Sequence, residues 1–142
     1  MSFSINIFKN HKKKFLRTKI IKKAVDLTLK NTEVKKANIN IILTDYISVK
    51  ELNKRFLKHN YETDVLAFRL DDEELEGEIY ISIETAEKQA EEYKVSLTNE
   101  LSRLAIHGTL HLIGYKDKSE EEKKEMHKIE DEILYKLKAR NG

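Results

Sequence analysis

Two histidines four positions apart are the residues in this sequence best suited to chemistry. His107 and His111 fall within a stretch, residues 98–112, whose apolar side chains recur at helical spacing. A helix places residues i and i+4 on one face, one turn apart, so a single metal ion can reach both imidazoles. Because such pairs also arise on helices by chance, a third ligand is needed before a metal site becomes the better interpretation.

A carboxylate follows the pair within a few residues. Gly114 is expected to end the helix, and a chain that reverses there brings Asp117 back over the helix end. Two histidines, one carboxylate and an open position for water make a known catalytic metal arrangement. We therefore predict a metal site of His107, His111 and Asp117. The alternatives are that Asp117 is a turn or capping residue, or that His127 on the last predicted helix takes its place.

The same sequence excludes several kinds of chemistry. The chain has no cysteine, so disulfides, thiolate catalysis and cysteine-ligated zinc are ruled out. In the motif His107-Gly108-Thr109-Leu110-His111 no glutamate stands between the histidines, so the general base of the zinc peptidases is missing. Gly108 indicates instead that this helix packs closely against another element.

Length and charge set the class of protein. The 142 residues, 39% of them hydrophobic, suit one domain spanning residues 1–142 with a single core. No apolar run approaches the length of about 18 residues that a membrane span needs, and the first residues lack the basic start of a signal peptide, so we expect a cytoplasmic protein. The formal net charge is only +2, but basic residues crowd the region from Lys9 to Lys23. This cluster can neutralise phosphates, or it can be a solvated helix face.

The periodicity of the chain predicts the scaffold that must hold the histidines. Alternating or continuous apolar residues predict four strands, at 5–8, 37–43, 63–68 and 77–83. Helical spacing and caps predict five helices, at 20–29, from a capping box at 48–51, at 86–94, at 98–112 behind Ser96 or Thr98, and from a second capping box at 119–122. We therefore expect an α+β domain with a small mixed β-sheet covered by helices, and with the metal site at the end of a central helix.

The motif around the histidines resembles that of a known family. Residues 107–115, HGTLHLIGY, resemble the HGxLHLxGYDH signature of the YbeY family of bacterial endoribonucleases. Residues 52–53 and 63–68 resemble that family's LN…TDVLSF block, and residues 77–82 resemble its GDIxIS strand. The resemblance runs in order, with matching gaps, over roughly residues 39–117.

The resemblance implies a metal-dependent, single-strand-specific endoribonuclease that acts in ribosomal RNA processing, at the 3′ end of 16S rRNA, and in ribosome quality control. It also implies a single α+β domain with one Zn²⁺ per chain, other divalent metals being possible. The implied partners are single-stranded ribosomal RNA and the small ribosomal subunit. Neither DNA nor a membrane is expected as a partner.

Two positions depart from the family pattern. The family has a histidine as third ligand where this chain has Asp117, and an arginine held to be important for activity where this chain has Leu57. A carboxylate can ligate zinc, so the site survives with a different charge. Arg103, one turn before His107, is a candidate substitute that binds substrate phosphate. No catalytic acid or base is identified from the sequence.

Two alternatives to a ribonuclease stay open. The chain can be a non-enzymatic ribosome-assembly factor whose metal is structural, which the missing family arginine favours, or a metal-dependent hydrolase of another substrate. A structural zinc site has four protein ligands, whereas a catalytic site keeps one position open for water. The geometry of the ligands is therefore the observation that separates enzyme from structural factor.

Overall fold

Four strands and five helices form the described part of the chain, which in this computed structural model comprises residues 2–13, 15–56, 64–71 and 73–141. The strands are β1 (Ser2–Lys9), β2 (Lys36–Thr44), β3 (Val65–Asp71) and β4 (Leu75–Ser82). The helices are α1 (Thr18–Lys30), α2 (Tyr46–Phe56), α3 (Ile83–Tyr93), α4 (Leu97–Ile113) and α5 (Glu120–Asn141). Over the described residues no helix is long and apolar enough to cross a membrane.

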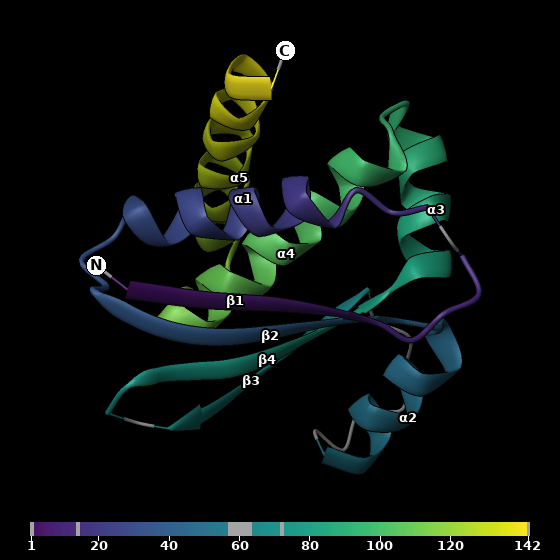
Figure 1. Cartoon of the computed structure of the whole chain (residues 1–142), viewed down its shortest axis with the longest axis horizontal. Helices are drawn as coiled ribbons and strands as arrows, with labels where there is room; N and C mark the ends of the chain where they lie inside the picture. Colours follow the sequence, from purple (N-terminus) through teal and green to yellow (C-terminus); the bar gives the residue numbers. More distant parts are fainter. Residues whose placement is uncertain (1, 14, 57–63, 72, 142) are drawn as a thin grey trace.

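The sheet is mixed, as predicted. Its order is β1-β2-β4-β3, with β2 parallel to both β1 and β4 and with β3 antiparallel to β4 (Figure 1). In β2 and β4 the isoleucines at 39, 41, 79 and 81 are fully buried, whereas Ser4 and Asn38 lie on the opposite face and are exposed. The alternation of β-branched and polar residues thus gives the sheet one buried face and one largely open face.

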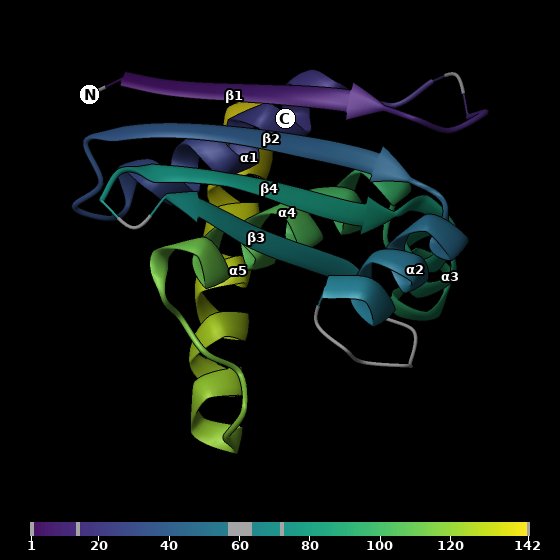
Figure 2. The ribbon, with the colours of Figure 1, turned by 90° about the horizontal axis from the view of Figure 1, so that it is seen from below.

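Helix α4 is central because it is covered on two sides. α1 and α4 pack against the buried face of the sheet, and α5 packs against both of them, so α4 lies between the sheet and α5 (Figures 1 and 2). A second apolar core joins α1, α4 and α5 and consists of Ala24, Leu27, Ile106, Leu110, Met126, Ile133 and Leu137. α2 lies on the other face of the sheet, against β3 and β4.

Local hydrogen bonds fix where α4 begins and ends. The Ser96 hydroxyl accepts a hydrogen bond from the N–H of Asn99 (3.0 Å), so Ser96, not Thr98, is the N-cap. Gly114 follows the last turn in a left-handed conformation (φ 118°), and its N–H donates to the carbonyl of Leu110 (3.1 Å). The helix therefore stops at the glycine that the sequence indicated.

The two predicted capping boxes have different outcomes. Ser119 Oγ accepts from the N–H of Glu122 (3.1 Å), and a carboxylate oxygen of Glu122 accepts from the N–H of Ser119 (3.0 Å), which confirms the box before α5. The box predicted at 48–51 is wrong. α2 already begins at Tyr46, because Asp45 Oδ1 accepts a hydrogen bond from the N–H of Ser48 (2.7 Å) and caps the first turn.

Gly108 allows α4 to lie close to strand β4. A Cβ atom at this position would come 2.7 Å from Cγ2 of Ile79, a fully buried side chain. Gly77, on β4, also allows the helix and the strand to lie close together, because a Cβ atom there would come 2.8 Å from both Cδ atoms of Leu112. The close packing predicted from Gly108 is confirmed, and it holds the histidine-bearing end of α4 against the sheet.

Gly108→Ala is expected to destabilise the protein, although alanine is the better helix former by about 1 kcal/mol. The added methyl group overpacks the contact with Ile79 at a cost of about 1–3 kcal/mol, so the free energy of unfolding should fall by up to about 2 kcal/mol. Urea denaturation of the wild type, the two single variants Gly108→Ala and Ile79→Ala, and the double variant measures this. In the Ile79→Ala background the methyl group has room and should cost little. An equal cost in both backgrounds would contradict the contact.

Candidate metal centre

The two histidines meet at the C-terminal end of α4. Nε2 of His107 and Nε2 of His111 are 3.0 Å apart, and the two rings stand nearly perpendicular, at 79°. Their side chains are 20% and 31% exposed, so solvent reaches the pair although most of each ring is covered. The spacing of four residues thus brings both imidazoles to one point, as the sequence predicted.

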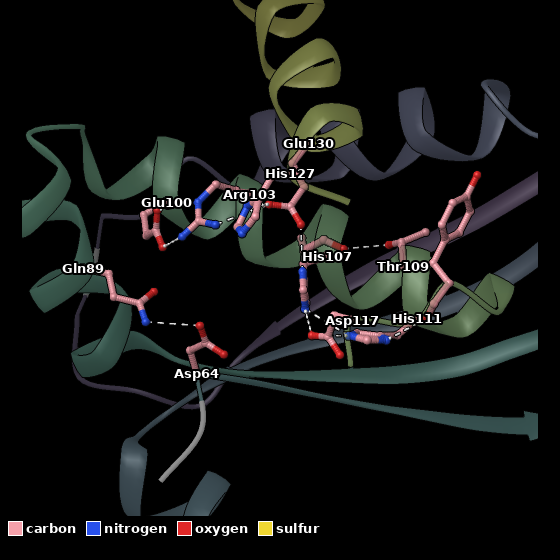
Figure 3. Close-up of polar contacts among 12 residues, drawn as sticks. Asp64, Gln89, Glu100, Arg103, His107, Thr109, His111, Asp117, His127 and Glu130 are labelled. Atoms are coloured by element: carbon pink, nitrogen blue, oxygen red, sulfur yellow. Dashed lines mark hydrogen bonds and ion pairs between the residues drawn. The ribbon is translucent and has the colours of Figure 1, made fainter. Parts of the chain in front are cut away.

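Asp117 joins the histidines after the chain reverses at Gly114. The N–H of Tyr115 donates back into the last turn of α4 (2.9 Å). Oδ2 of Asp117 then lies 3.3 Å from Nε2 of His107 and 3.4 Å from Nε2 of His111 (Figure 3). In a tetrahedral zinc site with bonds of about 2.1 Å, neighbouring donor atoms are about 3.4 Å apart. The spacing of the three side chains therefore fits a metal ion.

The hydrogen bonds behind the two rings determine which nitrogens face the centre. Nδ1 of His107 lies 2.7 Å from the carboxylate of Glu130, and Nδ1 of His111 lies 3.0 Å from the backbone carbonyl oxygen of Tyr115. Both partners accept hydrogen bonds, so each Nδ1 carries the proton and each Nε2 presents a lone pair. Two lone pairs and the Asp117 carboxylate at this separation repel one another unless a cation or a shared proton lies between them. The three donors form a group that could hold a divalent metal ion.

A buried charged network stands behind His107. Glu130, on α5, is fully buried and lies between His107 and Arg103, whose guanidinium is 3.3 Å from the second carboxylate oxygen. Arg103 also binds both oxygens of Glu100, which is fully buried as well. Burial lowers the pKa of His107, but the hydrogen bond and charge of Glu130 and the charge of Asp117 outweigh it, so the pKa is raised above its ordinary value.

Arg103 lies inside this network. Its side chain is 18% exposed, its guanidinium contacts the two buried carboxylates, and it stands over the ring of Tyr93 at 5.4 Å. The prediction that Arg103 binds substrate phosphate stays a prediction. What the structure provides is a close contact between this guanidinium and the glutamate that holds His107.

Among the described residues, neither His127 nor His11 belongs to the group of three donors. The side chain of His127 is 62% exposed, and its Nδ1 is 3.5 Å from Glu130, behind His107 (Figure 3). His11 forms an ion pair with a glutamate of α3. Leu57, which stands at the position of the family arginine, and His59 lie outside the described residues.

Asp64 flanks the centre from the side of the sheet. It precedes β3, and its carboxylate accepts a hydrogen bond from the amide of Gln89 on α3 (3.1 Å). Figure 3 shows Asp64 on the side of α4 that faces the sheet, where the three donors also lie. The charge of Asp64 adds to the rise in the pKa of His107, after the larger effects of Glu130 and Asp117. Sequence reasoning noted the block that contains Asp64 but assigned this residue no role.

Three protein donors would leave one position of a tetrahedral metal ion open. The side chain of Asp117 is 40% exposed, so the centre is open to solvent on that side. Within the described ranges no fourth histidine or carboxylate joins the group. Such a site binds water or a substrate oxygen in the remaining position, as catalytic zinc sites do, whereas structural sites are closed by a fourth protein ligand.

The chain is similar to known proteins in sequence and in fold. The sequence profile of the family described as "Endoribonuclease YbeY" matches residues 5–138. Proteins of that name from Chloroherpeton thalassium and Aquifex aeolicus are 38% and 37% identical, over 92% and 89% of this chain and 93% and 87% of their own length. The solution structure of TM1509 from Thermotoga maritima has a TM-score of 0.67 and 30% identity, over 96% of this chain and 90% of that one.

Removing any one of the three donors is expected to weaken zinc binding strongly. The variants that test this are His107→Ala, His111→Ala and Asp117→Ala. The loss should exceed the roughly 10–100-fold that removal of an outer-shell partner causes. Competition with a chromophoric chelator, after bound metal has been stripped, measures the affinity. His127→Ala is the comparison variant: its side chain contacts Glu130 and is not one of the three donors, so it should lose far less zinc affinity than the three donor variants do. Zinc lost in His127→Ala but retained in Asp117→Ala would make His127 the third ligand.

Proposed function

The chain belongs to the YbeY family of endoribonucleases, and from that premise we propose that it is a metal-dependent, single-strand-specific endoribonuclease that processes ribosomal RNA. The observation that carries the proposal is the convergence of two histidine nitrogens and one carboxylate oxygen at a point open to solvent. A non-enzymatic factor with a structural metal needs the remaining coordination position filled by protein. Among the described residues no further histidine, aspartate or glutamate joins the three donors.

The residues of the site determine the charge and the donor atoms around a bound ion. A divalent ion supplies Lewis-acid charge to a phosphate oxygen and to an attacking water. His107 and His111 would hold it through neutral nitrogens, while Asp117 would add a negative charge that a third histidine would not. We propose one Zn²⁺ per chain. The harder oxygen donor makes manganese or magnesium stronger competitors for this site than three histidines would allow.

RNA is proposed to bind through its phosphates. Described lysines of the basic cluster lie at the end of β1 and on α1, whereas α4, which carries the two histidines, packs against β3 and β4. β1 and β3 are the opposite edges of the sheet (Figure 2). Lys116 and Lys118 flank Asp117 and are exposed. We propose that Lys116 and Lys118 bind the phosphates next to the cleaved bond. The N-terminal cluster is proposed to bind a more distant part of a long RNA, such as that of the small ribosomal subunit.

The metal-loaded protein is expected to cut a single-stranded RNA covering the 3′ end of 16S rRNA and to leave DNA of the same sequence intact. Chelation should stop the cleavage, and re-addition of zinc, manganese or magnesium should show which ion restores it. Denaturing electrophoresis of end-labelled substrate follows the reaction. His111→Ala should cut at the background rate. Equal cleavage by His111→Ala would contradict the proposed site, and no cleavage by a fully metal-loaded wild type would favour the structural factor.

Matched lysine variants locate the RNA within the same assay. Lys116→Ala/Lys118→Ala and Lys19→Ala/Lys22→Ala each remove two exposed charges, the first pair beside the centre and the second on α1. A short substrate should be cut more slowly by the first double variant only. A substrate that extends well beyond the cleaved bond should be affected by both. If both double variants cut both substrates at the wild-type rate, RNA does not bind through these lysines.

A further inference from the structure

Glu130 places a carboxylate in the apolar interior between α4 and α5. Its side chain is fully buried, and Met126, Ile133 and Leu137 on the same side of α5 belong to the second apolar core. Taking a charge out of water is costly even when it is paired, and apolar residues of similar volume often replace buried ion pairs without loss of stability. A buried carboxylate at such a position is expected to have a role other than stabilising the fold.

The two oxygens of Glu130 have different partners. Oε2 lies 2.7 Å from Nδ1 of His107, while Oε1 lies 3.3 Å from the guanidinium of Arg103 and 3.5 Å from Nδ1 of His127. The other side of the Arg103 guanidinium is bound by the buried carboxylate of Glu100. A continuous series of charged hydrogen bonds thus runs from the first turn of α4, across to α5, and back to the metal centre (Figure 3).

The two histidine ligands differ in what lies behind them. Nδ1 of His111 bonds to a neutral backbone carbonyl within its own segment, that of Tyr115. Nδ1 of His107 bonds to an anion that belongs to another helix. A carboxylate in this position fixes the tautomer and the orientation of the ring and makes the imidazole a stronger ligand. The packing of α5 on α4 is therefore coupled to the direction in which Nε2 of His107 points.

We propose that Glu130 is a positioning residue of the metal centre, which holds His107 in the Nδ1–H tautomer with Nε2 directed at the ion, and that Arg103 in turn holds Glu130. The inference rests on the proposed metal site. Glu130 acts through His107 and contacts neither ion nor substrate. On this account Arg103 serves the site by orienting a carboxylate instead of by binding phosphate.

Zinc affinity of Glu130→Gln tests the proposal. The amide keeps the volume of the side chain but loses its charge, and we expect zinc affinity to fall by about 10–100-fold. Glu132→Gln is the matched control, because it makes the same chemical change at an exposed position of α5, and its affinity should equal that of the wild type. Unchanged affinity in Glu130→Gln together with a strong loss in His107→Ala overturns the positioning role and leaves the metal site in place. Unchanged affinity in both overturns the metal site itself.

The histidine tautomers of the metal-free protein give a second readout. Its decisive part uses the wild type alone, so it does not depend on whether a variant folds. Long-range ¹H–¹⁵N correlation spectra at alkaline pH, where histidines are neutral, distinguish imidazoles protonated at Nδ1 from those protonated at Nε2. In the wild type both His107 and His111 should be protonated at Nδ1. In Glu130→Gln the Nε2–H form of His107 should gain population, while His111 stays unchanged. Protonation of wild-type His107 predominantly at Nε2 overturns the proposal.

Discussion

The hydrogen bond between Glu130 and Nδ1 of His107 joins two helices that must be placed separately before it can form. α4 has to lie close against the sheet, which Gly108 and Gly77 permit because a side chain at either position would collide with the opposing element. α5 has to pack on α4 with the face that carries Glu130. The buried apolar residues of α5 determine this orientation. The same reversal at Gly114 that starts the path toward α5 also carries Asp117 to the histidines. The ligands, the turn and the helix packing are therefore parts of one arrangement.

The features that depend on short-range physics could be predicted from the sequence. The i, i+4 histidine pair, the left-handed Gly114 and the capping box at Ser119 each act within a few residues, and all three are present as expected. The approach of Asp117 to the pair followed from the position of the glycine. The mixed sheet could also be predicted, since strands and helices alternate early in the chain. The start of α2 was misplaced because two capping residues, Asp45 and Ser48, compete there and only one of them caps the helix.

The buried network could not be predicted in the same way. Glu130 is one of many acidic residues in α5, and its role depends on which face of that helix packs on α4, which is a tertiary property. One signal was present, because Glu130 falls at helical spacing among Met126, Ile133 and Leu137 and so occupies a core position. The contact of Arg103 with Glu130 could not be predicted for the same reason, because it forms only when α5 covers α4. Its contact with Glu100 is local, between residues three positions apart on α4.

The structure of the zinc-loaded protein tests the central claim most directly. Anomalous scattering at the zinc edge locates the ion without reference to any assumed ligand. The account predicts one zinc per chain, bound by Nε2 of His107 and Nε2 of His111 at about 2.0–2.1 Å and by Asp117 at about 2.0–2.2 Å, with water in the remaining position. Nδ1 of His107 should still bond to Glu130. Zinc bound elsewhere, or bound by four protein side chains with no open position, would contradict the account.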